Sequence, residues 1–205
     1  MHKFTISKIF IFICLTMFLS TSFVSETNAK TTKLYKTKRE YVSLKTKKSD
    51  TFEHPSTITK EELENFLQTV KYKQCKFVSW DWKSSKQVFT SRQLDLLANY
   101  GSKALAQATD HEYVDFAFTT PSRQFRRYTK GKLFIHNNNL HIIFDRIEEP
   151  GADKSPEHYE LGEGSWEVVP NGTNQRIQAN KYGSKQKNWL VVSLNKKKTD
   201  SSIEQ

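Results

Sequence analysis

Two helix-start signals ahead of a strand-rich half constrain the fold more than any other feature of this sequence. Thr59 and Thr90 each stand three residues before a Glu or Gln. This is the spacing of a capping box, in which the two side chains satisfy backbone amides at a helix N-terminus. Apolar residues at helical spacing follow each signal, over 63–70 and 94–108. The sequence therefore predicts two amphipathic helices, and the small residues of the second allow it to lie close to a sheet.

Most of the remaining chain shows the two-residue period of β-strands. In residues 113–118, Val114, Phe116 and Phe118 alternate with other residues. No internal repeat or second domain is visible, and helices followed by a run of strands indicate the α+β class. We expect a single domain with two helices packed on a mainly antiparallel sheet of about five to six strands. The other expected strands cover residues 76–82, 126–136, 140–146 and 166–169, a run near Ile177, and 189–194.

The first 29 residues have the composition of an export signal. A positively charged start and an apolar run from Ile9 to Leu19 precede Thr27-Asn28-Ala29, which fits cleavage before Lys30. The apolar run is shorter than the roughly 20 residues that span a bilayer, so no transmembrane segment is expected after removal of the signal. An uncleaved anchor is the alternative. Cleavage would leave Cys75 as the one cysteine, so the domain must be held together by packing without an internal disulfide.

Positive charge is concentrated in one segment near the N-terminus. Residues 30–48 contain eight Lys or Arg and a single acidic residue, Glu40. This segment has no sustained apolar period, so we expect a flexible chain that is attracted to anionic surfaces. The predicted organisation is a signal peptide over 1–29, a basic flexible linker over 30–56, a single α+β domain over 57–195 and a polar tail over 196–205.

Two groups of side chains are candidates for binding. Trp80 and Trp82 lie on one face of an expected strand, where indole rings could stack on sugars or on an apolar partner. The alternative is that they pack beneath a helix. The second group consists of cations with aromatic residues between them, and it could bind an anionic surface or an acidic protein. The alternative is that these cations are solvated at the edge of a sheet and bind nothing. These cations are Arg123, Arg126, Arg127 and Lys130.

His136 and His141 are the candidates for metal ligands. A type I′ turn at Asn138-Asn139 would pair the two histidines across a hairpin, where they could share an ion with Asp145. The alternative is that both histidines are solvated at the end of a strand and bind no metal ion. The sequence contains no HExxH motif, no Gly-x-Ser-x-Gly motif and no glycine-rich phosphate loop. We therefore expect no catalytic residues and no cofactor.

These features together predict an exported, non-catalytic bacterial envelope protein. It would act as a binding or assembly module, with its basic N-terminal tail directed at anionic surfaces. The expected partner is an envelope protein or an anionic envelope surface of lipid head groups, lipopolysaccharide or wall polymer, and export makes nucleic acid the least natural ligand. The expected location is the periplasm or the cell envelope. The alternatives are a periplasmic metal-assisted hydrolase that uses His136 and His141, and a secreted extracellular factor.

Overall fold

The computed structural model describes residues 31–76, 83–122, 126–150 and 163–194. Its described elements form a seven-stranded sheet in the order β1-β2-β5-β6-β7-β10-β9 and a three-stranded sheet in the order β4-β3-β8, and neighbouring strands are antiparallel throughout. The helices are α2 (Lys60–Gln68) and α3 (Ser91–Gln107). The strands are β1 (Thr32–Lys36), β2 (Tyr41–Thr46), β3 (Lys71–Lys76), β4 (Lys86–Gln87), β5 (Glu112–Pro121), β6 (Arg126–His136), β7 (Asn139–Pro150), β8 (Glu163–Val169), β9 (Gln175–Ala179) and β10 (Lys185–Ser193).

Both helices begin where the capping boxes predict. The Thr59 hydroxyl accepts a hydrogen bond from the Glu62 amide at 3.1 Å, and the Glu62 carboxylate accepts one from the Thr59 amide at 3.0 Å. Thr90 and Gln93 form the same reciprocal pair at the start of α3. These contacts satisfy amides that have no partner within the helix. The two predicted helices and their N-termini are confirmed.

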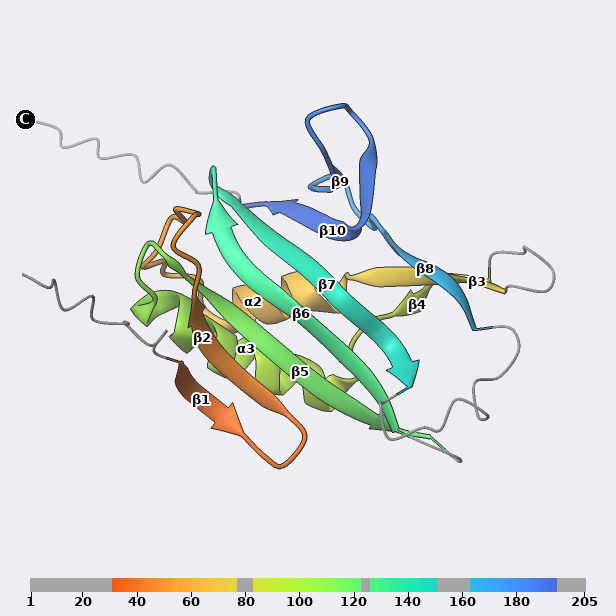
Figure 1. Cartoon of the computed structure of the whole chain (residues 1–205), viewed down its shortest axis with the longest axis horizontal. Coiled ribbons are helices and arrows are strands. Elements are labelled where there is room, and N and C mark those ends of the chain that lie inside the picture. Colours follow the sequence, from red (N-terminus) through yellow and green to blue (C-terminus); the bar gives the residue numbers. More distant parts are fainter. Residues whose placement is uncertain (1–30, 77–82, 123–125, 151–162, 195–205) are drawn as a thin grey trace, which may run out of the picture.

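The helices cover one face of the large sheet (Figure 1). Their apolar stripes pack against alternate residues of the central strands, so the main core lies between helices and sheet. Gly101 of α3 allows close approach at this interface. A Cβ atom there would lie 3.2 Å from Leu63 of α2 and 3.8 Å from Leu133 of β6. The α+β class and the antiparallel sheet are therefore as predicted.

The large sheet exceeds the five to six strands that we expected, because the basic N-terminal segment is folded. Residues 30–56 were predicted as a flexible linker, but they contain β1 and β2 at one end of the sheet. Val42 and Leu44 of β2 are completely or almost completely buried, and β2 pairs with β5 from Tyr41 to Thr46. In β2 only Val42 and Leu44 show the alternation of a half-buried strand, and they stand among Tyr, Ser, Lys and Thr. This pattern is too short to predict the strand from the sequence. The linker prediction is wrong for this part of the chain.

The hairpin of β6 and β7 turns one residue earlier than predicted. Asn137 and Asn138 have positive φ angles of 50° and 54°, as a type I′ turn requires. His136 consequently pairs with Asn139, and His141 pairs with Phe134. The Glu53 carboxylate accepts hydrogen bonds from the amides of Asn137 at 2.7 Å and Asn138 at 2.9 Å. This contact between the loop after β2 and the turn favours the observed register.

Several predictions fall on residues outside the described part of the chain. They are the signal peptide over 1–29, Trp80, Trp82, Arg123 and the polar tail over 196–205. Among the described residues, neither helix has the length and apolar character needed to cross a membrane.

Candidate functional site

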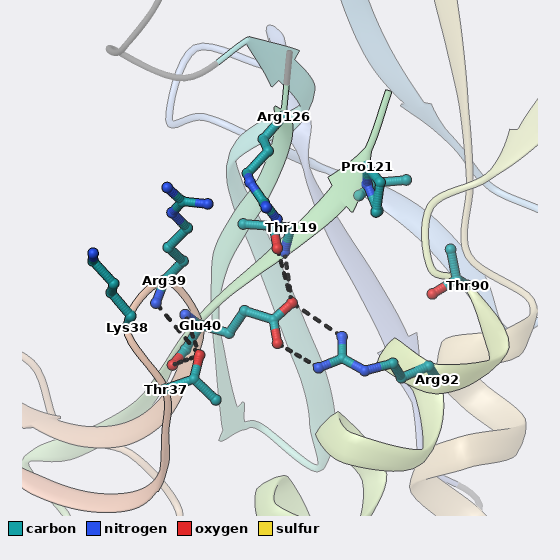
Figure 2. Close-up of a pocket in the computed structure, with 10 residues that line it drawn as sticks. Thr37, Lys38, Arg39, Glu40, Thr90, Arg92, Thr119, Pro121 and Arg126 are labelled. Atoms are coloured by element: carbon teal, nitrogen blue, oxygen red, sulfur yellow. Dashed lines mark hydrogen bonds and ion pairs between the residues drawn. The ribbon is translucent and has the colours of Figure 1, made fainter. Parts of the chain in front are cut away.

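A cavity of about 650 Å³ lies where the β1–β2 turn meets the start of α3 and the adjacent ends of β5 and β6 (Figure 2). We call it the Glu40 cleft, because the Glu40 carboxylate lies at its centre. Its volume falls within the range of small-molecule sites. Its lining residues are Thr37, Lys38, Arg39, Glu40, Thr90, Arg92, Thr119, Thr120, Pro121 and Arg126.

The Glu40 carboxylate is fixed by partners from three other elements, and the weakest contact is that of Tyr35 on β1, whose hydroxyl donates to Oε2 at 3.4 Å. Arg92 of α3 donates from Nη1 to Oε1 at 3.0 Å and from Nη2 to Oε2 at 2.5 Å. The backbone amide and the hydroxyl of Thr119 on β5 both donate to Oε1, at 3.1 Å and 3.0 Å. Such a two-pronged contact with a guanidinium is the strongest geometry for a carboxylate. Glu40 is thus held in one orientation, and only 5% of its surface is exposed.

These contacts hold the pKa of Glu40 at about 2, well below its ordinary value of 4.5. The Arg92 hydrogen bonds are the largest cause, and the two Thr119 donors add to them, while burial acts in the opposite direction. Glu40 is consequently ionised across the neutral range. It neutralises Arg92 and cannot exchange protons near pH 7.

Local sequence places each of these groups. Thr37 closes the β1–β2 turn, because its amide donates to the Glu40 carbonyl at 2.8 Å and its hydroxyl accepts from the Glu40 amide at 3.0 Å. The Thr90 cap sets the start of α3, which directs Arg92 of its first turn at Glu40. Gln93 Nε2 donates to the Thr120 hydroxyl at 3.2 Å, and this bond ties α3 to the end of β5.

Three further cations line the cleft, and within the described part of the chain no carboxylate neutralises them. They are Lys38, Arg39 and Arg126, and all three are exposed. Among the described residues, no ion pair or side-chain hydrogen bond involves their charged groups. Figure 2 shows Lys38 and Arg39 on one side of Glu40 and Arg92 on the other. Because Glu40 and Arg92 cancel each other, the described lining residues carry an excess of three positive charges, a charge distribution suited to an anionic ligand.

The described cations of the predicted 123–130 group, Arg126, Arg127 and Lys130, do not line one site. Arg126 lines the cleft, whereas Arg127 Nη1 donates to the Glu148 carbonyl at 2.7 Å. Lys130 Nζ lies 3.8 Å from the Asp145 carboxylate. The structure instead combines Arg126 with Lys38 and Arg39, two residues of the segment predicted to be a flexible tail.

Sequence reasoning missed both Glu40 and Arg92 as site residues. Glu40 had one visible signal, since it is the single acidic residue between positions 30 and 48. An isolated carboxylate in a basic segment can indicate a fixed ion pair, but its partner is 52 positions away. No local pattern identifies that partner.

The two candidate metal ligands do not form the expected cross-strand pair. Trp189 Nε1–H donates to His141 Nδ1 at 3.0 Å, and because an indole N–H can only donate, His141 Nε2 carries the proton and donates to the His136 carbonyl at 3.1 Å. Both ring nitrogens of His141 are therefore occupied. Asp145 lies near Lys130 and Lys132 instead. Within the described ranges, no group of three His, Cys, Asp or Glu side chains could hold a metal ion.

No protein-family model matches the chain, and comparisons with curated proteins and with solved structures found no match. What the chain binds must therefore be inferred from its own residues.

Proposed function

We propose that this chain is an exported, non-catalytic binding module of the bacterial envelope, and that its Glu40 cleft attaches it to a phosphate-bearing surface. One observation carries the proposal. Lys38, Arg39 and Arg126 line one cavity, although they come from segments about 90 positions apart, and no carboxylate neutralises them within the described residues. Anionic lipid head groups and phosphodiester wall polymers share the ligand chemistry that such a cleft suits. The export signal predicted over residues 1–29 supplies the compartment.

The chemistry of Glu40 is unsuited to general-base catalysis. A general base works best when its pKa lies near the operating pH. Glu40, with a pKa of about 2, is far from that condition and is fully engaged by Arg92 and Thr119. The other lining residues are Thr, Lys, Arg and Pro. A threonine hydroxyl becomes a nucleophile only beside a base, and the described lining residues include no histidine. The Thr120 hydroxyl contacts a carboxylate that is not among them, since it donates to Glu148 at 2.7 Å.

The expected contribution of the cleft is measurable. A Lys or Arg close to an anionic membrane contributes about 1 kcal/mol. Three such residues would contribute about 3 kcal/mol, which corresponds to a change in affinity of about 100-fold. Because these side chains are exposed, salt screens them, and the Debye length is about 8 Å at physiological ionic strength.

The test compares two triple variants of the chain lacking residues 1–29. Lys38→Gln/Arg39→Gln/Arg126→Gln removes the cleft cations. Lys86→Gln/Lys181→Gln/Lys185→Gln removes the same charge from exposed positions that do not line the cleft. Co-sedimentation with phosphatidylglycerol vesicles and pull-down with poly(glycerol phosphate) distinguish the lipid source from the polymer source. Vesicles of phosphatidylcholine measure background binding.

We expect the cleft variant to lose about 100-fold in affinity for one phosphate-bearing probe, and the control variant to lose much less. Equal losses in both variants would show that net charge alone drives binding and would overturn the role of the cleft. No binding of either probe by the unmodified chain would overturn the proposed ligand. The proposed export is tested separately by N-terminal sequencing of the protein isolated from cells. The sequence should begin at Lys30, and recovery of Met1 from the cytosol would contradict export.

A further inference from the structure

A second cavity, of about 530 Å³, lies at the tip of the β6–β7 hairpin. Arg126 of the Glu40 cleft and His136 of this cavity occupy opposite ends of β6, so the two sites are about 30 Å apart at the usual rise of a strand. We call the second site the hairpin cavity. Its lining residues are Asp50, Thr51, Phe52, Phe134, His136, Asn137, Asn139, His141, Arg176, Gln178 and Trp189.

One wall of the hairpin cavity is a cluster of four rings. Phe134 stacks on His141 with ring centroids 4.9 Å apart and planes 6° apart. Phe52 packs against Phe134 at 4.7 Å, and Trp189 meets Phe134 at 6.1 Å with an interplanar angle of 70°. Phe52 reaches this cluster because Glu53 binds the amides of the hairpin turn. Trp189 is half-buried, and so part of its indole ring is accessible from the cavity.

The ring cluster is rigid and uncharged. The Trp189 indole N–H and both His141 nitrogens are satisfied by each other and by the His136 carbonyl. Burial is the main cause that lowers the pKa of His141, and so its ring is neutral at pH 7. A ligand can therefore contact the apolar faces of this wall without competing for its polar atoms.

The rim of the hairpin cavity offers hydrogen-bonding groups that the fold does not use. Among the described residues, the side chains of Thr51, His136 and Asn137 make no hydrogen bond within the protein. Asp50 and Arg176 are the charged residues of the described lining, and their opposite charges cancel, although Asp50 also pairs with Lys47 outside the cavity. The cavity consequently has no excess charge of either sign, in contrast to the Glu40 cleft.

We propose that the hairpin cavity binds a neutral sugar ring of a saccharide. A pyranose presents an apolar C–H face, which suits the half-buried Trp189 ring, and a periphery of hydroxyl groups, which suits Thr51, His136 and Asn137. A purely apolar ligand would leave these rim groups without partners, and an anion would find no net positive charge. The cavity volume accommodates one or two rings. This site is independent of the proposed attachment through the Glu40 cleft.

The test follows the indole N–H signals of the chain lacking residues 1–29 by ¹H–¹⁵N NMR during titration with cellotetraose, chitotetraose and maltotetraose. At least one saccharide should shift the Trp189 signal saturably, with a dissociation constant of about a millimolar. The Trp166 indole N–H, which is bonded to Glu149 at 2.6 Å and does not line the cavity, serves as the internal reference. Trp189→Phe assigns the signal.

Thr51→Ala/His136→Ala removes two rim groups that make no hydrogen bond in the fold, and it should weaken saccharide binding about tenfold. Thr57→Ala, at an exposed position outside the cavity, should leave the affinity unchanged. Saccharide binding should also be unaffected by salt and by the Lys38→Gln/Arg39→Gln/Arg126→Gln substitutions, so that failure of one site is distinguishable from failure of the other. Absence of any saturable shift, or equal shifts of Trp166 and Trp189, would overturn the proposal.

Discussion

Glu40→Gln is the most direct test of the bonding that shapes the cleft. A glutamine has the same shape and still accepts hydrogen bonds from Thr119, but Arg92 loses its counter-charge. The pKa of Glu40 falls from 4.5 to about 2 in the folded chain. At about 1.4 kcal/mol per pKa unit, ionised Glu40 contributes up to about 3 kcal/mol to the free energy of unfolding. The Arg92 side chain is 57% exposed, so solvent screens the pair, and we expect a loss of about 2 kcal/mol.

Urea unfolding between pH 7 and pH 2.5 measures this contribution. With a denaturant slope of about 2 kcal/mol per molar, the midpoint at pH 7 should fall by about 1 M in Glu40→Gln. Because the folded pKa lies below the unfolded value, the stabilisation is fully present above about pH 4.5 and is lost as the pH falls toward 2. The difference in urea midpoint between the unmodified chain and Glu40→Gln should therefore narrow as the pH falls over this range.

Glu64→Gln, on α2 and outside the cleft, is the matched control and should leave the midpoint at pH 7 nearly unchanged. Equal midpoints for Glu40→Gln and the unmodified chain at pH 7 would refute the reasoning. A difference in midpoint that stays constant down to pH 2.5 would also refute it. A loss of stability that does not depend on the ionisation of Glu40 cannot come from its charge.

Two further predictions concern the core and the pH dependence of stability. Gly131→Ala should cost about 1–3 kcal/mol in calorimetry, because a Cβ atom would overlap the Ile143 carbonyl oxygen and lie 2.9 Å from the Phe116 ring. Gly101→Ala, where the nearest atom is the movable tip of Leu63 at 3.2 Å, should cost less, and equal losses would contradict this explanation. Burial lowers the pKa of His54 from 6.5 to about 4, so the unfolded chain takes up the proton first and stability should fall as the pH drops from about 6.5 to 4. His54→Gln should flatten this decline, and identical pH profiles with and without His54 would show that another group causes it.

The sequence alone predicted those elements whose signals are local. Thr59 and Thr90 mark the helix starts because a capping bond joins residues three apart, and the alternation at 113–118 predicts β5 because side chains of a strand alternate between its faces. The hairpin was also predicted, but its turn was placed one residue too late, because a run of three asparagines offers two positions for the turn. Glu53, which binds the turn amides from more than 80 positions away, favours the observed alternative.

The candidate site depended on contacts that no local pattern encodes. A run of lysines looks the same in a flexible tail and in an edge strand, and only the pairing of β2 with β5 distinguishes the two. Burial of Val42 and Leu44 against the core offsets the entropy lost in ordering that segment. Once it is ordered, Lys38 and Arg39 lie beside Arg126, and Arg92 reaches Glu40. Local sequence thus determined the helices and most strands through short-range hydrogen bonding and periodicity. Only the tertiary structure decided where the positive charge gathers, because electrostatic attraction and burial depend on distance in space.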